Sequence, residues 1–307
     1  MSLADVLPRL TALTALDLSD NAVGDEGASH LFPALRGRIL PTGGPHPPLQ
    51  VLCLTHASFG VEGARALASV LPSLRNLREL DVEGAMWGGS VTLLTPCLKH
   101  LTALSTLKIS RNRFIPANDI ILLHDSDDDN QAGDGGATPI IEYSAIDLLL
   151  SIAQLTGLQR MEMAGCCQQG LVPMEALAAC LAELTSLTHL DLSSSDLDDN
   201  AMVPLIEGGL KHLSGLRHLD LSCNPIGALG WSALGLSVFP RLGARLESLS
   251  MAETLLADAL EAVEVTAGAE EVDLPSAAFL QGLQYCTGLK SLNLVRVIET
   301  LCVYGKH

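Results

Sequence analysis

The sequence predicts an α/β solenoid of about nine stacked repeats, and three observations lead to this fold class. The first is a recurring phrase: residues 13–21 (LTALDLSDN) return as residues 187–195 (LTHLDLSSS) and as residues 216–224 (LRHLDLSCN). The second is the regular spacing of such phrases, because self-similarity at a fixed period marks repeat architectures. The third is composition: apolar residues make up 48% of the chain and aromatic residues only 3%, which favours a layered core of leucine and alanine.

The spacing of the phrases defines the repeats and the domain. The first leucine of each LxxLxL phrase serves as a marker, and the markers are Leu13, Leu49, Leu77, Leu104, Leu158, Leu187, Leu216, Leu246 and Leu289. Uninterrupted repeats are 27 to 30 residues long. Longer gaps place insertions near residues 36–48, 113–142 and 257–275. We therefore expect residues 1–307 to form a single elongated domain that is interrupted by three insertions.

Each repeat begins with a predicted strand and a bend. The LxL segment alternates apolar and polar residues, which is typical of a short strand with one buried face. The bend that follows is marked by Asn21, Asn112 or Asn224, or by Cys166 at the equivalent place. We expect these side chains to bond the backbone inside the bend, where water cannot reach.

A helix completes each repeat. Its start contains glycine, as in residues 23–28 (VGDEGA) and residues 59–64 (FGVEGA). The following segment places apolar residues three and four apart, as at Leu67, Leu71 and Leu74, which predicts an amphipathic helix. One strand and one helix cannot bury this apolar surface alone, so neighbouring repeats must stack.

The phrase DLSxN followed by VGDEGA resembles the ribonuclease-inhibitor-like class of leucine-rich repeats. The resemblance implies a curved α/β horseshoe with an inner parallel β-sheet and outer helices. It covers nearly the whole chain except the insertions and the last ten residues. The third repeat departs from the pattern with Ala85 where asparagine is usual, and the ninth departs with Val297. These departures concern local geometry and leave the predicted fold unchanged.

The charge balance restricts the partners. The formal net charge is −17, which disfavours direct binding to DNA, RNA or anionic membranes. Few aromatic side chains are present to stack nucleic-acid bases. No apolar run reaches the roughly 18 residues of a membrane span, and the N-terminus lacks a basic signal segment. The sequence thus predicts an intracellular, cytoplasmic protein whose partners are proteins with a basic surface.

The cysteines agree with that compartment. The chain has eight of them, with an adjacent pair at Cys166 and Cys167 but no CxxC spacing. Most occupy positions that we expect to be buried, including Cys53, Cys97, Cys180 and Cys223. Reduced thiols in an intracellular protein are favoured over the alternative, a disulfide framework.

The candidate binding surface is the concave face of the predicted sheet. The residue between the last two leucines of each phrase points into that face, and five of the nine such residues are acidic. Adjacent parallel strands lie about 4.8 Å apart, so these like charges repel and a cationic partner relieves them. The predicted protein-binding residues, including flanking positions, are Asp17, Glu79, Asp81, Glu83, Glu162, His189, Asp191, His218, Asp220 and Glu253.

Two alternatives stand beside this hypothesis. Aspartate before Leu-Ser is common in this repeat class, so the acidic positions also fit a solvated surface without a partner. His189 and His218 occupy matching positions beside Asp191 and Asp220, which suggests a metal or catalytic pair. No third ligand or nucleophile has a defined spacing, so neither a metal nor a cofactor is expected.

The longest insertion contains an acidic run, residues 125–136 (DSDDDNQAGDGG). An EF-hand loop beginning there requires glycine at the sixth position and glutamate at the twelfth, but the chain has Asn130 and Gly136. A solvated loop is favoured, with an acidic docking loop and a calcium site as alternatives. The first and last repeats lack polar caps, which predicts that another protein covers an end or that the chain belongs to a longer repeat protein.

No enzyme signature is found: GxxxxGK[ST], GxGxxG, GxSxG and HExxH are all missing from the sequence. The leading hypothesis is a non-catalytic protein–protein interaction scaffold, a structural subunit of a larger intracellular assembly. Alanine- and glycine-rich repeats of this type resemble those of ciliary or flagellar axonemes, a cytoskeletal location, and of organellar complexes.

Two further classes of function remain open. The GTPase-activating protein of Ran shares this repeat class, but no arginine lies in the bends around Asn21 or Ala57. The repeat region of a NOD-like receptor is the other class, and it requires a nucleotide-binding module upstream of the repeats.

Overall fold

The computed structural model describes residues 2–36, 49–87, 89–114, 143–170, 172–254 and 275–295. The three predicted insertions fall almost entirely between these ranges. The predictions for the acidic run at residues 125–136 therefore lie outside the described residues.

The strands form one parallel sheet in which each repeat pairs with the repeats before and after it. All eight pairings join three residues to three residues without a shift in register. The strands are β1 (Ala15–Asp17), β2 (Val51–Cys53), β3 (Glu79–Asp81), β4 (Thr106–Lys108), β5 (Arg160–Glu162), β6 (His189–Asp191), β7 (His218–Asp220), β8 (Ser248–Ser250) and β9 (Ser291–Asn293). The predicted α/β solenoid of about nine repeats is confirmed.

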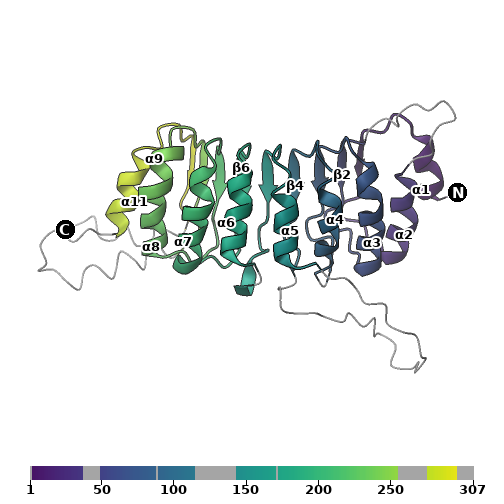
Figure 1. Cartoon of the computed structure of the whole chain (residues 1–307), viewed down its shortest axis with the longest axis horizontal. Helices are drawn as coiled ribbons and strands as arrows, with labels where there is room; N and C mark the ends of the chain where they lie inside the picture. Colours follow the sequence, from purple (N-terminus) through teal and green to yellow (C-terminus); the bar gives the residue numbers. More distant parts are fainter. Residues whose placement is uncertain are drawn as a thin grey trace, which may run out of the picture.

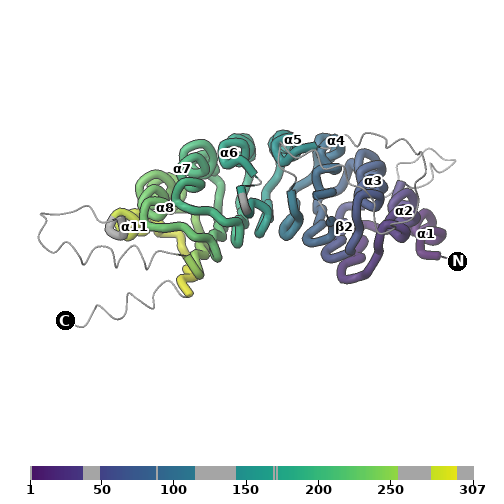
Figure 2. Tube along the Cα trace, turned by 90° about the horizontal axis from the view of Figure 1, so that it is seen from below, coloured from purple at the N-terminus to yellow at the C-terminus, as the bar shows by residue number. Residues whose placement is uncertain are grey.

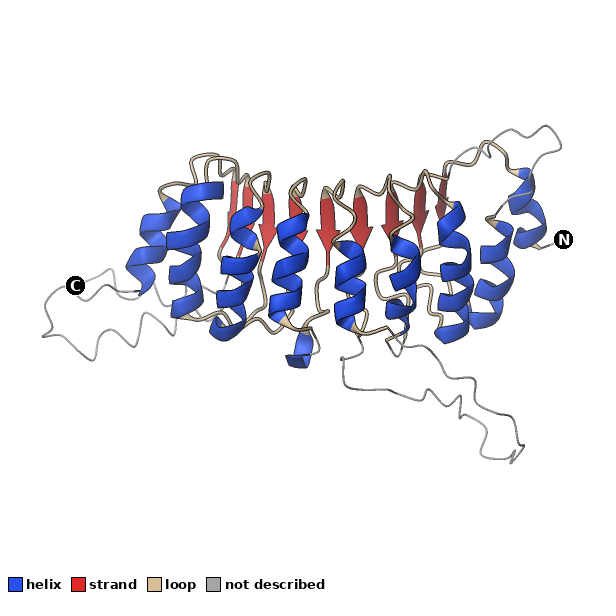
Figure 3. Cartoon of the chain, in the orientation of Figure 1, coloured by secondary structure: helices blue, strands red, loops and turns tan. Residues whose placement is uncertain are grey.

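Helices lie along the opposite side of the repeats from the strands (Figures 1 and 3). The α-helices are α1 (Leu3–Val6), α2 (Gly24–Ala34), α3 (Val61–Val70), α4 (Thr95–Leu98), α5 (Ala145–Ile152), α6 (Met174–Glu183), α7 (Asp199–Gly208), α8 (Ala228–Ala233), α9 (Phe239–Leu242) and α11 (Pro275–Leu283). The shorter helical turns are η1 (Leu7–Arg9), η2 (Leu71–Ser73), η3 (Ser90–Leu94), η4 (Gln168–Gly170), η5 (Leu210–His212) and η6 (Leu234–Val238).

The repeats stack into an arc, with the strands on its inner side and the helices on its outer side (Figure 2). The first and last repeats lie at opposite ends of the arc. The side chains at the two ends of each strand therefore face the concave side, and the middle side chain faces the helices.

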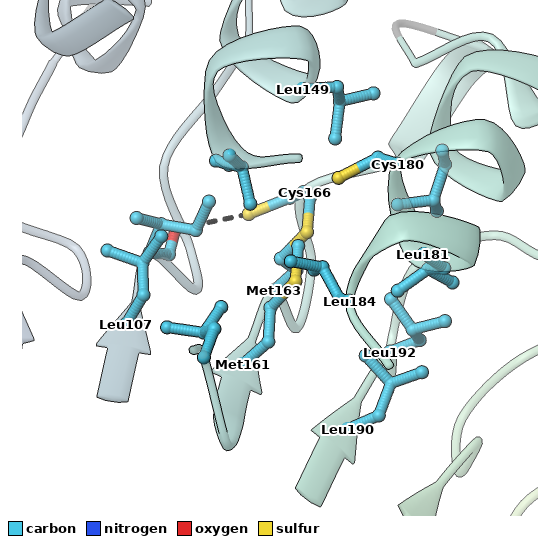
Figure 4. Close-up of a cluster of buried hydrophobic side chains, with 14 of the residues drawn as sticks. Leu107, Leu149, Met161, Met163, Cys166, Cys180, Leu181, Leu184, Leu190 and Leu192 are labelled. Atoms are coloured by element: carbon cyan, nitrogen blue, oxygen red, sulfur yellow. Dashed lines mark hydrogen bonds between the residues drawn. The ribbon is translucent and has the colours of Figure 1, made fainter. Parts of the chain in front are cut away.

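The core consists of the middle residue of each strand packed against the helices. Leu80, Leu107 and Met161 are fully buried, and Figure 4 shows Leu107, Met161 and Leu190 in successive repeats under Leu149 and Leu181. Leu292, at the same position in the last described strand, is 41% exposed because no described repeat stacks on it. Each repeat is thus buried mainly by its neighbours, as a solenoid requires.

The predicted bonds inside the bends are present. Asn224 is buried, and its amide group donates to the carbonyl oxygens of Leu192 and Leu221, both at 2.9 Å. Its Oδ1 accepts the backbone N–H groups of Ser195 and Leu197. Cys166 fills the same place two repeats earlier by donating its thiol to the Ile109 carbonyl, the dashed contact of Figure 4.

Every described bend also contains a residue in the left-handed conformation. These residues, three positions after the last strand residue, have φ between 53° and 71°. They are Asp20, His56, Gly84, Arg111, Gly165, Ser194, Cys223 and Glu253. Because this conformation turns the chain back toward the helices, it places one residue per described bend on the rim beside the concave face, and six of these eight residues carry a side chain.

The cysteines differ from the sequence expectation at two positions. Cys97, Cys166, Cys167 and Cys180 are buried as predicted, and the described cysteines are free thiols. Cys223 is exposed, because it is the left-handed residue of its bend. Cys53 is only half-buried, because it is the last residue of β2 and faces the concave side.

Candidate functional site

The sheet brings the last residues of the strands into one row across the concave face. We call this row the concave row, and its register pairs join each member to the next. Its members are Asp17, Cys53, Asp81, Lys108, Glu162, Asp191, Asp220, Ser250 and Asn293. A second row, formed by the first strand residues, contains Glu79, Arg160, His189, His218 and Ser248.

The acidic residues of β3 are paired with a lysine of the next strand. The Lys108 ammonium lies 3.1 Å from a carboxylate oxygen of Asp81 and 3.2 Å from one of Glu79. Burial opposes the charge of Lys108, but hydrogen bonds and attraction from these two carboxylates outweigh it and raise the pKa of the lysine. This part of the row therefore already holds the cation that its carboxylates attract.

Other predicted acidic residues also have neighbours within the chain. Glu83 lies 3.4 Å from the guanidinium of Arg111, and Glu162 pairs with Arg160 of its own strand. Glu253 accepts the thiol of Cys223 at 3.7 Å. Asp17 is exposed at the N-terminal end of the row and accepts the backbone N–H of Ser19. Of these four residues, Glu162 is the register partner of Asp191 and lies beside the charges of β6 and β7. The other three lie on β1 or in the bends after β3 and β8.

Asp191 and Asp220 stand apart electrostatically. Each accepts the backbone N–H of the serine two residues later, at 2.9 Å. Within the described part of the chain, neither carboxylate forms an ion pair. Burial raises the pKa of Asp191, and the charges of Asp220 and Glu162 add to this, while hydrogen bonds from Ser193 oppose it. The middle of the concave face thus carries adjacent negative charges without a cation.

Two histidines stand beside these carboxylates. The rings of His189 and His218 are stacked, with centroids 4.0 Å apart and planes inclined by 13°. Burial lowers the pKa of His189, and His218 and Arg160 lower it further. Nδ1 of His189 lies 2.8 Å from the hydroxyl oxygen of Thr188. The two imidazoles therefore lie side by side, and the lowered pKa favours the neutral form of the His189 ring.

The histidines and aspartates line a shallow hollow of about 340 Å³. It extends from Arg160 and Glu162 of β5 to Ser248 and Ser250 of β8. The small serines leave room beside His218 and Asp220, their partners in the sheet register. The predicted binding residues include neither serine, although the eighth LxxLxL phrase places Ser250 on the concave face and Ser248 two residues before it.

A larger hollow, of about 550 Å³, lies at the rim between the fourth and sixth repeats. Arg111, Arg113 and Gln168 contribute polar groups to it. None of these three residues was among the predicted binding residues. Arg111 was detectable in principle, because it occupies the bend position three residues after the predicted strand at β4.

One group of potential metal ligands occurs among the described residues. Ligand atoms of Cys53, Glu79 and Asp81 lie within 4.8 Å of one another. The Lys108 ammonium contacts both carboxylates. Burial and these two carboxylates also raise the pKa of the Cys53 thiol, which disfavours the thiolate that would bind a metal. The group is therefore explained by an internal ion pair.

Comparison with known proteins identifies the class. A family model described as a leucine-rich repeat matches residues 10–32, 183–205 and 212–235. The chain is 37% identical over 110 residues to human "NACHT, LRR and PYD domains-containing protein 13". The match covers 36% of this chain and 10% of that protein, so the chain spans a small part of this relative. Together with the parallel sheet, these matches show that the chain contains leucine-rich repeats; the ribonuclease-inhibitor-like subtype stays a prediction.

Solved structures with similarity to the chain include domains of two other proteins. The tropomodulin C-terminal domain of Caenorhabditis elegans has a TM-score of 0.39 and 14% identity, covering 59% of this chain and 90% of that one. The functional domain of InlJ from Listeria monocytogenes has a TM-score of 0.44 and 18% identity, covering 94% and 45%. Nothing about function follows from similarity at this level. Among the described residues, no helix has the length and apolar character needed to cross a membrane.

Proposed function

We propose that the chain is a non-catalytic protein-binding module that holds a partner with a basic surface in its concave face. Leucine-rich repeats generally mediate protein–protein interaction, and this chain offers a long, curved sheet face for that purpose. The observation that carries the proposal is the contrast within the concave row. The Lys108 ammonium compensates the carboxylates of β3, whereas Asp191 and Asp220 lack an ion pair among the described residues.

The electrostatics favour a cationic partner at β6 and β7. Burial, and in addition the neighbouring charge of Asp220, gives the ionised form of Asp191 a free-energy cost, which its raised pKa expresses. A partner's cation lowers that cost, so part of the binding energy comes from relief of repulsion already present in the free protein. The net charge of −17 supports the same partner class, because it accelerates encounter with basic surfaces and opposes binding of nucleic acid or anionic membrane.

The wider role that we propose is a scaffold in a larger intracellular assembly. The described residues support it by their shape, since an arc of stacked repeats presents a long curved surface. An axonemal or organellar assembly is the specific form of this proposal that the sequence resemblance suggests.

A second candidate is the repeat region of a receptor of the NOD-like type. The 37% identity over 110 residues to a human protein named for NACHT, LRR and PYD domains favours it. In that case the concave face binds a ligand or an adjoining domain of the receptor. The full-length transcript tests this candidate: a P-loop nucleotide-binding domain encoded upstream of the repeats supports it, and a transcript without one removes it.

The test of the leading proposal is a native pull-down with three proteins at low and high salt, read by mass spectrometry. The proteins are the unmodified chain, a concave variant (Asp191→Asn with Asp220→Asn) and a convex control (Glu26→Gln with Glu175→Gln). Both variants remove two negative charges, and Glu26 and Glu175 are exposed on α2 and α6. We expect basic partners that bind the unmodified chain and the convex control at low salt but not the concave variant. Equal recovery by all three proteins contradicts the proposal.

A further inference from the structure

The hollow on β6, β7 and β8 has features that discriminate between kinds of basic side chain. One face of the His218 ring is covered by the His189 ring, at a centroid distance of 4.0 Å. On its other side, the register partner in β8 is Ser248, a small residue that lines the hollow. The hollow therefore borders a flat imidazole face.

A carboxylate stands next to that ring face. Asp220 is two residues after His218 on the same strand, so the two side chains rise from the same face roughly 6.6 Å apart along the chain. Asp191 extends the negative charge to the neighbouring strand, where it is the register partner of Asp220. The flat ring and the two carboxylates thus line the same hollow, on the strands β6 and β7.

We propose that this hollow is a subsite for an arginine side chain of the partner, whose guanidinium pairs with Asp220 and Asp191 and stacks on the uncovered face of His218. This proposal rests on the proposed function and specifies which basic side chain of the partner the concave face binds. A guanidinium is planar and weakly hydrated, so it can stack on a ring while its N–H groups bind a carboxylate in bidentate geometry. An ammonium group of lysine supplies the charge alone.

The charged groups around the hollow favour a site for a single guanidinium of the partner over a site for an extended basic patch. Arg160 and Glu162 of β5 pair with each other at one side. Beyond the other side, Glu247 pairs with both Arg217 and Lys290, at 2.7 and 2.6 Å. The two carboxylates without an ion pair therefore lie between charged groups that already form ion pairs with one another, which limits the site for a cation to the width of β6–β8.

The test uses two capped pentapeptides, Gly-Ser-Arg-Ser-Gly and Gly-Ser-Lys-Ser-Gly, titrated at low salt into the 15N-labelled full chain. We expect amide shifts at residues 189–191, 218–220 and 248–250, and tighter binding of the arginine peptide by about two- to tenfold. Two variants of His218 separate stacking from charge. His218→Leu is expected to abolish the preference for arginine, whereas His218→Phe keeps it, because only phenylalanine retains a flat ring. Asp220→Asn is expected to weaken both peptides.

The outcomes distinguish the subsite from the proposed function. Equal affinity of both peptides at β6–β8 overturns the arginine subsite and leaves the basic-partner proposal in place. A preference for arginine that survives His218→Leu also overturns the stacking contact. If neither peptide shifts the amides of β6–β8, both the subsite and the binding face proposed above are contradicted. The comparison of arginine with lysine on the unmodified chain requires no variant, so a variant that fails to fold does not obscure the result.

Discussion

Asp199 caps the helix of the following repeat through Gly230, whose backbone N–H it accepts at 2.8 Å. The same carboxylate oxygen accepts the N–H of Gly227, also at 2.8 Å. Asp25 repeats this arrangement with Gly60 and Gly63. A Cβ on Gly230 would lie 2.9 Å from the Asp199 oxygen and 2.7 Å from Cγ2 of Ile226. The relationship explains why glycines recur at the helix starts: an aspartate of one repeat satisfies the free N–H groups of the next.

Removal of this cross-repeat cap should destabilise the solenoid. Asp199→Ala leaves the N–H groups of Gly227 and Gly230 without their acceptor, and we expect a loss of about 1–2 kcal/mol in the free energy of unfolding. Asp199→Asn keeps one acceptor oxygen and should lose less. Urea unfolding measures both, with Asn200→Ala on the same exposed turn as a control expected within about 0.5 kcal/mol of the unmodified chain. Equal stability of Asp199→Ala and the control would refute the capping role.

The buried asparagine of the bend should contribute more than its exposed counterpart. Asn224→Ala leaves backbone groups of Leu192, Leu221, Ser195 and Leu197 without their partner in the interior. We expect a loss of about 2–4 kcal/mol in unfolding free energy. Asn21→Ala removes bonds to only two carbonyls in an exposed bend and should cost about 1 kcal/mol or less. Similar losses at the two positions would show that burial of the bend does not set the cost.

The ionised carboxylate of Asp191 should lower the stability of the folded chain at neutral pH. Because burial raises the pKa of Asp191, the folded state binds the carboxyl proton more tightly than the unfolded state does. The contribution of Asp191 to stability is therefore greatest below its unfolded-state pKa and is lost as pH rises through its folded-state pKa. Asp191→Asn should therefore melt at the same or a higher temperature than the unmodified chain at pH 7, with a smaller difference near pH 4.

Asp17 is the matched control, since it has the same place in its repeat. Hydrogen bonds from Ser19 lower the pKa of Asp17, so its contribution is present at neutral pH and is lost as pH falls. Asp17→Asn should not raise the melting temperature at pH 7. Destabilisation by Asp191→Asn that is as large as that by Asp17→Asn would contradict the account of the uncompensated charge.

Thiol reactivity should follow burial and pKa. Burial raises the pKa of Cys166, Cys167 and Cys180 to about 12, so hardly any thiolate forms at pH 8 in the folded chain. Cys223 is exposed on the rim. Among the described cysteines, iodoacetamide should modify Cys223 first and reach Cys166, Cys167 and Cys180 only after denaturant is added, as peptide mass spectrometry can show. Rapid modification of Cys180 in the native protein would mean that its repeat opens locally, and Cys223→Ser checks the assignment of the first site.

The fold was largely predictable because repeats convert local patterns into long-range contacts. The LxL spacing predicted the strands, and in-register stacking then placed His189 beside His218 and Asp191 beside Asp220. The phrase DLSxN predicted the bonds of the bend, since an asparagine at that point has only backbone groups to bond. These features depend on sequence position within one repeat, which the sequence displays directly.

The charge pattern of the site was less predictable. The repeat pattern predicted which acidic residues lie on the concave face. It did not predict their ion pairs, because these depend on how far the long side chains of neighbouring residues reach. Lys108 contacts both Glu79 and Asp81 of the preceding strand. The charges of these two predicted binding residues are therefore compensated within the chain. The room beside His218 depends on the serines of β8, and polar residues of small volume gave no signal by composition or charge.

The central claim is that a partner binds the concave face around Asp191 and Asp220, and calorimetric titration of a purified partner from the pull-down tests it most directly. The titration compares the unmodified chain, the concave variant Asp191→Asn with Asp220→Asn, and the convex control Glu26→Gln with Glu175→Gln. We predict a dissociation constant raised about tenfold or more by the concave variant and changed less than about twofold by the convex control. An unchanged dissociation constant for the concave variant, or an equal rise for both variants, would contradict the claim.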